Sequence, residues 1–267
     1  QGLPKLPTDH KVRYIDLLSD SGLRYIEAVS FVNPKIIPQM ADAVEVALGI
    51  IRSPDVTYSA LVPSLKYYEK AKEARMPEIA VFISANEEHN TKNLGRSIAD
   101  TQPILEEVIR AASSDGKKVR GYISTVFGYH SPSDTPISKA IELSRWMLEK
   151  GVYQVSLGDT EGVADSRAIS SRLANIKSEL DLNNFALHLH TIPEDMKKQV
   201  HAAYSAGIRT FDSSCGGIGG CPTDELLANV DTLFLAREFE IGSIKTGIDL
   251  DKLAKADEYI SGLVKQT

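Results

Sequence analysis

The feature that most limits the fold is the alternation of short β-branched segments with longer amphipathic ones. Strands are expected at 24–32, 56–64, 78–85, 118–127, 152–160, 184–190 and 207–214. Helices are expected before, between and after them, at 8–22, 38–52, 63–75, 97–116, 135–151, 166–181, 193–207 and 223–239. A helix between each pair of strands forces parallel pairing through right-handed crossovers. The sequence therefore predicts an α/β fold.

The element order favours a barrel over a doubly wound sheet. A doubly wound sheet usually carries a Gly-rich phosphate loop after its first strand, and no GxGxxG or Walker motif occurs in this sequence. The length of 267 residues suits one (β/α)8 TIM barrel. The chain opens with a helix, with eight helices to seven strands. We therefore expect one barrel domain over 1–267, its first strand absent from this sequence, with a C-terminal helix at about 249–264.

Composition excludes several classes of protein. There are 36 acidic and 30 basic residues, and a net charge of −6 argues against a general nucleic-acid binder. No apolar run approaches the roughly 18 residues that span a bilayer, and no secretory signal is visible. Two cysteines suit a reducing compartment. We expect a small-molecule substrate, no nucleic-acid or membrane partner, and a cytoplasmic location.

The segment NFALHLH points most directly to chemistry. Side chains alternate along a strand, so Phe185, Leu187 and Leu189 share one face, while His188 and His190 share the other. The histidines come at the C-terminal end of the strand, where barrel active sites are built. Two neutral imidazoles on one side are a common divalent-metal arrangement, and two hydrogen-bonded interior histidines are the alternative.

Two carboxylates lie within or at the end of an expected strand, where a charged side chain needs a partner or a function. Glu27 is inside a strand, and it is either an active-site carboxylate or a partner in an internal salt bridge. Asp159 ends a strand and precedes a Gly-containing loop. It is expected to act in the active site, as a base or by orienting a histidine, or else to cap the next helix.

The other polar candidates are weaker on their own. Cys221 lies in the glycine-rich segment SCGGIGGCP, which can present a thiol as an acid or base, whereas Cys215 is expected to be a packed small residue. Asn229 offers a carbonyl oxygen that suits a hard metal ion. The remaining histidines are expected on the surface, at His10, His89, His130 and His201.

Taken together, seven segments resemble the 3-hydroxy-3-methylglutaryl-CoA lyase family. They are YIEAVSFVNPKIIPQM, VFISANEEHNTKNLGRSI, RGYISTVFG, VSLGDTEGV, HLHT, FDSS and GGIGGCP, in the order of the family and across nearly the whole chain. The HxH pair alone would indicate only the wider superfamily of metal-dependent lyases and Claisen-condensing barrels. The GGIGGCP, SFVNPK and SLGDT segments are more specific to the lyase branch.

The resemblance implies a TIM-barrel enzyme that binds Mg²⁺ or Mn²⁺. It would cleave an acyl-CoA to acetyl-CoA and acetoacetate, act in leucine degradation and ketone-body formation, and form a homodimer. By the same resemblance His188, His190 and Asn229 match metal ligands. Cys221, Asp159 and Glu27 match catalytic residues of the family. Lys92 and Asn93 fall where the family approaches its CoA substrate.

The chain departs from the family at three places. The family's Arg-Asp pair, whose Asp is a metal ligand, would precede Gln1, and without it the ligands here are neutral and suited to Mg²⁺ only weakly. The loop after Cys221 is about two residues shorter than usual, and FGYHSPSD replaces the usual FGCPY. Two alternatives therefore stand beside the lyase: a Claisen-condensing acyltransferase and a degenerate, non-catalytic barrel.

Overall fold

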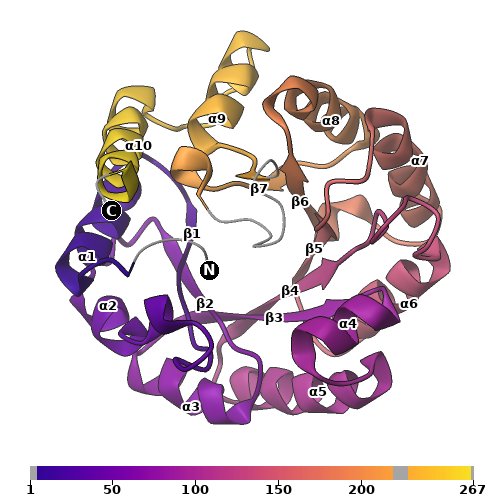
Figure 1. The fold of residues 1–267 in the computed structure, drawn as a ribbon, viewed down its shortest axis with the longest axis horizontal. Coiled ribbons are helices and arrows are strands. Elements are labelled where there is room, and N and C mark those ends of the chain that lie inside the picture. The colour runs from indigo at the N-terminus through magenta and orange to yellow at the C-terminus, as the bar shows by residue number, and fades with distance from the viewer. Residues whose placement is uncertain (1–4, 219–227, 266–267) are drawn as a thin grey trace. The chain divides into compact units, whose positions relative to one another are not determined.

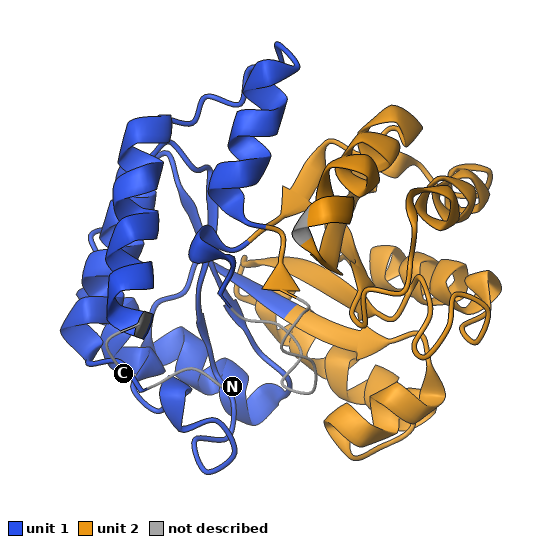
Figure 2. Ribbon diagram, turned by 45° about the horizontal axis from the view of Figure 1, so that its top comes forward, with its two compact units in different colours: residues 1–80, 214–219, 231–267 blue, residues 81–213, 220–230 orange. Residues whose placement is uncertain are grey.

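The structure is a computed structural model that describes residues 5–218 and 228–265. The chain divides into two compact units, shown in blue and orange in Figure 2. Unit 1 comprises residues 1–80, 214–219 and 231–267, and unit 2 comprises 81–213 and 220–230. Strand β3 begins in the first unit and ends in the second. The expected single domain over 1–267 stays a prediction.

Unit 1 contains the ends of the chain and the first parallel strands. Its elements are α1 (Thr8–Asp20), β1 (Tyr25–Ser30), the 3₁₀ turn η1 (Pro38–Met40), α2 (Ala43–Gly49), β2 (Thr57–Leu61), α3 (Leu65–Glu73), the start of β3 (Glu78–Ser84), the 3₁₀ turn η3 (Cys215–Gly217), α9 (Thr232–Ile241) and α10 (Leu250–Lys265). Strand β1 pairs in parallel with β2, and β2 with the first residues of β3.

Unit 2 contains five further strands, of which four pair in parallel along one row and the fifth pairs antiparallel with one of these four. Its elements after β3 are α4 (Glu87–Leu94), α5 (Ile98–Ser114), β4 (Lys118–Ser124), α6 (Ile137–Glu149), β5 (Gln154–Asp159), α7 (Ser166–Lys177), the 3₁₀ turn η2 (Leu182–Asn184), β6 (Phe185–Thr191), α8 (Pro193–Ala206), β7 (Thr210–Asp212) and β8 (Ala228–Asn229). Strand β5 pairs in parallel with β4 and β6, and β6 pairs with β7. Helices α6, α7 and α8 follow one another along the outer side of these strands (Figure 1).

All seven expected strands are present, and the C-terminal helix ends one residue beyond its expected bound. Helix α1 begins at Thr8, the expected first residue, directly after Pro7. The structure differs from the expected elements at two places. Helix α4, capped by the Asn86 side chain, had not been expected. Residues 228–229 form the short strand β8, and the helix expected from 223 begins at Thr232.

The alternation in β6 produces the expected two faces. Phe185, Leu187 and Leu189 are at most 2% exposed, as befits the apolar side of a strand covered by helices. The imidazoles of His188 and His190 lie against each other on the other face. Burying the three apolar side chains therefore determines where the histidines project. In the described part of the chain, no helix is long and apolar enough to cross a membrane.

Asp159 stabilises the loop that leads from β5 to α7. Its two carboxylate oxygens accept hydrogen bonds from the backbone N–H groups of Val163 (3.1 Å) and Ala164 (3.0 Å). The side chain is fully buried. Burial raises the pKa of Asp159 to about 6, although the two N–H donors and the nearby Arg172 act in the opposite direction.

This pKa predicts a pH dependence of stability. Because the folded state holds the Asp159 proton more tightly than the unfolded chain, whose pKa is near 3.8, stability is lost as pH rises between 3.8 and about 6. Asp159→Asn cannot titrate. The free energy of unfolding can be measured with urea for both proteins at pH 4.5 and at pH 7.5. The difference between the native protein and Asp159→Asn should be about 2 kcal/mol less favourable to the native protein at pH 7.5 than at pH 4.5. A difference that is flat or rises with pH would contradict this assignment.

A candidate metal centre at the end of strand β6

The two histidines of β6 meet through their Nε2 atoms. His188 Nε2 and His190 Nε2 are 3.1 Å apart, with the rings tilted by 42°. His190 is 8% exposed, and the side chain of His188 is 29% exposed. Burial, and to a lesser extent the neighbouring His188, lowers the pKa of His190 to about 4. At neutral pH, His190 is therefore an uncharged imidazole with one nitrogen lone pair to offer.

Asn229 is brought to the same place by a strand that the sequence did not predict. Strand β8 pairs antiparallel with β6, and His190 and Asn229 are register partners. The backbone N–H of Val230 donates to the carbonyl of Leu189 at 3.3 Å. Residues directly opposite each other in an antiparallel pair project to the same face. The amide of Asn229 therefore lies on the face that carries the histidines.

Beside the histidines lies a buried ion pair between β4 and β7. Arg120 is 1% exposed and binds both oxygens of Asp212, at 2.7 Å from Nη2 and 3.1 Å from Nη1. Its remaining contacts run from Nε to Gln154 Oε1 (3.0 Å) and from Nη1 to the Tyr122 hydroxyl (2.8 Å). Ser156 Oγ donates to Asp212 Oδ2 at 2.6 Å. Every polar side chain in this group comes from a strand.

The register of the strands builds this cluster. His188 is the partner of Asp212, and Arg120 is the partner of Gln154. The nearest atoms of His188 and Asp212, Nδ1 and Oδ2, are 3.5 Å apart. Burial alone would raise the pKa of Asp212, but Arg120 and then His188 hold it well below its usual range. The carboxylate is therefore ionised beside the histidine.

Asp159, the expected catalytic residue on the neighbouring strand β5, does not join this cluster. Asp159 is the register partner of Leu189, and its carboxylate is among the charges that act on Arg172 of helix α7. Its side chain therefore lies on the sheet face opposite the histidines, where it holds the loop. Glu27 is an exposed residue of β1 in unit 1. Cys221 lies outside the described residues.

Lys92 and Asn93 lie on α4 in unit 2, and both are exposed. Lys92 Nζ donates to the Tyr129 hydroxyl at 3.1 Å. His89 on the same helix is buried, not on the surface as expected, with its ring edge-on to Tyr129. The helix turns that face inward, because Asn90 beside it is fully buried and bonded to the backbone of Ser84.

The remaining expectations concern the exposure of three histidines and of Cys215. His130 and His201 are exposed as expected, whereas His10 is half-buried, with its Nδ1 2.6 Å from the Tyr259 hydroxyl. Cys215 is the expected packed thiol: it is 3% exposed and in no disulfide.

Sequence reasoning missed the ion pair itself. Arg120 and Tyr122 alternate along KVRGYIS, and an arginine inside a predicted strand is the same kind of signal that drew attention to Glu27. Its partner, however, is 92 residues away. A single sequence contains no sign of which buried carboxylate an interior arginine will meet.

The donor atoms here fit one divalent cation. Two ligand atoms about 2.1 Å from the same cation and at right angles to each other are about 3 Å apart. The Nε2 atoms are 3.1 Å apart, and the buried Nδ1 of His190 has no hydrogen-bond partner among the described residues. In the same part of the chain, no group of three or more His, Cys, Asp or Glu residues suits a metal. Within the described residues, a third ligand would therefore be of another type, such as the amide of Asn229.

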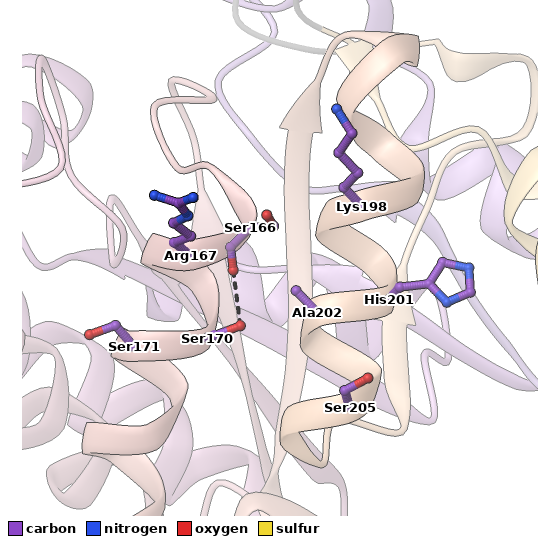
Figure 3. A pocket seen from close by; sticks show the side chains of 8 residues that line it. All are labelled: Ser166, Arg167, Ser170, Ser171, Lys198, His201, Ala202 and Ser205. Atoms are coloured by element: carbon purple, nitrogen blue, oxygen red, sulfur yellow. Dashed lines mark hydrogen bonds between the residues drawn. The ribbon is translucent and has the colours of Figure 1, made fainter.

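A hollow of about 740 Å³ lies on the outer surface between α7 and α8 (Figure 3). Serines and cationic side chains line it: Ser166, Arg167, Ser170, Ser171, Lys198, His201 and Ser205, with Ala202. His201 points away from Arg167 and Lys198, so the cationic groups do not converge on one point (Figure 3). The hollow is a polar surface groove and includes neither histidine of β6.

Comparison with known proteins identifies the family and supports the fold. The sequence profile of the family described as HMGL-like matches residues 4–260. A Pseudomonas aeruginosa protein named 3-hydroxy-3-isohexenylglutaryl-CoA/hydroxy-methylglutaryl-CoA lyase is 38% identical over 95% of this chain and 85% of its own.

Solved structures agree with the sequence matches. The HMG-CoA lyase of Bacillus subtilis superposes with a TM-score of 0.95 at 38% identity, covering 98% of this chain and 88% of that one. An HMG-CoA lyase of Acinetobacter baumannii, solved with coenzyme A and 3-methylmalate, gives a TM-score of 0.92 at 32% identity, over 99% and 87% of the two chains. These matches confirm the expected α/β barrel class. The chain belongs to the HMGL-like family, whose members include the hydroxymethylglutaryl-CoA lyases.

Proposed function

We propose that this protein is a divalent-metal-dependent carbon–carbon lyase that cleaves 3-hydroxy-3-methylglutaryl-CoA to acetyl-CoA and acetoacetate. The observation that supports this most is the pair of Nε2 atoms 3.1 Å apart at the end of β6, in a chain of the HMGL-like family. Relatives named as lyases of this substrate cover nearly the whole chain. Family membership alone leaves open whether a chain retains the chemistry, and the paired imidazoles support the view that this one does.

The metal would be held by His188 Nε2, His190 Nε2 and the amide oxygen of Asn229. Mg²⁺ and Mn²⁺ both accept such ligands, with further positions filled by substrate oxygens, water or a carboxylate outside the described residues. When bound, the metal would lower the pKa of the substrate's tertiary hydroxyl and orient that oxygen.

The reaction is a retro-Claisen cleavage that needs no second substrate. The hydroxyl loses its proton, the carbon–carbon bond breaks, and its electron pair goes to the carbon that becomes the methyl group of acetyl-CoA. That carbon takes up one proton, so the proton count balances. We assign this protonation to Cys221, following the family resemblance. A catalytic role for Asp159 and Glu27 stays a prediction.

The substrate is expected to extend toward α4. Lys92 and Asn93 are exposed there, and an ammonium group suits the phosphates of CoA. The resemblance to the family supports a homodimer, and the low cysteine content supports a cytoplasmic location.

The first test is the reaction itself. Full-length protein incubated with 3-hydroxy-3-methylglutaryl-CoA and Mn²⁺ should release acetoacetate, and a chelator should abolish the release. His188→Ala should lower turnover by at least about 100-fold, because it removes a metal ligand. His201→Ala, on the outer face of α8, is the matched histidine control and should retain native turnover. Condensing activity alone, or no metal-dependent product, would overturn the proposal in favour of a synthase or a non-catalytic barrel.

The second test separates the acid from the metal site. Cys221→Ala should lose most turnover and keep native affinity for Mn²⁺, because a thiol that protonates the enolate carbon is not a metal ligand. Cys215→Ala is the control, since Cys215 is buried in unit 1 and hydrogen-bonds through its backbone oxygen to Tyr14. Loss of Mn²⁺ binding in Cys221→Ala would show that the cysteine has been assigned the wrong role.

A further inference from the structure

The carboxylate of Asp212 is held by more donors than an ion pair needs. Two guanidinium nitrogens of Arg120 and the hydroxyl of Ser156 all donate to it, at 2.6 to 3.1 Å. Three donors aimed at one buried carboxyl group favour its ionised form, which can only accept hydrogen bonds. In any further hydrogen bond to Asp212, the neighbouring group therefore has to be the donor.

His188 is the group that approaches it. Its Nδ1 lies 3.5 Å from Asp212 Oδ2, within ion-pair distance, and this buried nitrogen makes no hydrogen bond to any other group among the described residues. A neutral imidazole has one N–H and one lone pair. Placing the hydrogen on Nδ1, toward the carboxylate, leaves the lone pair on Nε2, which faces His190.

Arg120 also constrains the ring of His188 from a second side. Its Nη1 donates to the Tyr122 hydroxyl, and the Tyr122 ring lies edge-on to His188 at 82°, with centroids 6.2 Å apart. The guanidinium also lies over the Tyr122 ring, 5.0 Å from its centroid. One buried side chain thus holds both of these neighbours of the imidazole in place.

His190 has no such support. Like that of His188, its Nδ1 is buried without a hydrogen bond among the described residues, but no carboxylate of that part of the chain lies within ion-pair distance of it. In the metal-free protein its Nε2 faces the lone pair of His188 Nε2 at 3.1 Å and donates a hydrogen bond to it, so the tautomer of His190 follows that of His188 and is not set by a carboxylate.

We propose that Asp212, fixed by Arg120, is a positioning residue that sets His188 in the Nδ1–H tautomer and presents its Nε2 lone pair to the divalent cation, whereas His190 is left without such a partner. The identity of the cation site rests on the proposed function. The tautomer does not, because it follows from contacts within the protein. A carboxylate behind a ligating histidine typically fixes the ring and strengthens the ligand.

The decisive experiment needs neither metal nor substrate. In metal-free native protein labelled with ¹⁵N-histidine, two-bond ¹H–¹⁵N correlation spectra at pH 8 distinguish the Nδ1–H and Nε2–H forms. Comparison with His188→Gln identifies the His188 signals. We expect the Nδ1–H form for His188. The Nε2–H form, or an even mixture of the two, would overturn the proposal.

The variant Asp212→Asn tests the cause. Its amide oxygen would remain with Arg120, and its NH₂ group would then face His188 Nδ1 and donate to it. We expect the His188 signal to change to the Nε2–H form and the affinity for Mn²⁺, measured by calorimetry, to fall about 10- to 100-fold. An unchanged tautomer together with native Mn²⁺ affinity would contradict the proposal.

Ser156→Ala is the matched control, because it removes a donor to the same oxygen and leaves the His188 contact in place. It should keep the Nδ1–H form. Circular dichroism reports whether each variant folds, and if Asp212→Asn does not, the native tautomer still decides the question. Absence of Mn²⁺ binding by the native protein would refute the proposed function and leave the tautomer result standing on its own.

Discussion

The buried ion pair between Arg120 and Asp212 is the interaction on which the site depends. Removing a guanidinium from water costs several kcal/mol, and the cost is recovered only when its donors all find partners in good geometry. Arg120 meets that condition with contacts to Asp212, Gln154 and Tyr122. Two of these partners come from other strands, Gln154 from β5 and Asp212 from β7. The pair is therefore satisfied in one register only, since a slip of one residue would turn the side chains to the other face.

That register also gives the histidines their place. His188 is the β6 residue opposite Asp212, and His190 follows it on the same face. The short antiparallel strand β8 then adds Asn229 opposite His190. The polar cluster is too costly to bury unless all of its members are paired. Its pairing therefore determines the position of an imidazole that can bind a metal. The HMGL-like family supplies the reaction in which such a metal would be used.

Much of this could be predicted from the sequence, because it is encoded locally. Period-two alternation placed the strands and separated the histidines of β6 from its leucines, and the family motifs indicated the chemistry. What escaped prediction depends on contacts between distant residues. Arg120 and Asp212 are 92 residues apart, and Asn229 lies in a strand only because β6 is there to pair with it. Asp159 was correctly singled out as an unusual carboxylate, but only the pairing with Leu189 shows that it faces away from the histidines.

The central claim is that the imidazoles of β6 bind the cation while Asp212 remains behind them with Arg120. A crystal structure of the Mn²⁺-soaked protein, with an anomalous difference map, measures this most directly. The account predicts an anomalous peak within about 2.3 Å of both His188 Nε2 and His190 Nε2, with the Arg120–Asp212 ion pair intact. A peak elsewhere in the protein, or Asp212 released from Arg120 to bind the metal itself, would contradict it.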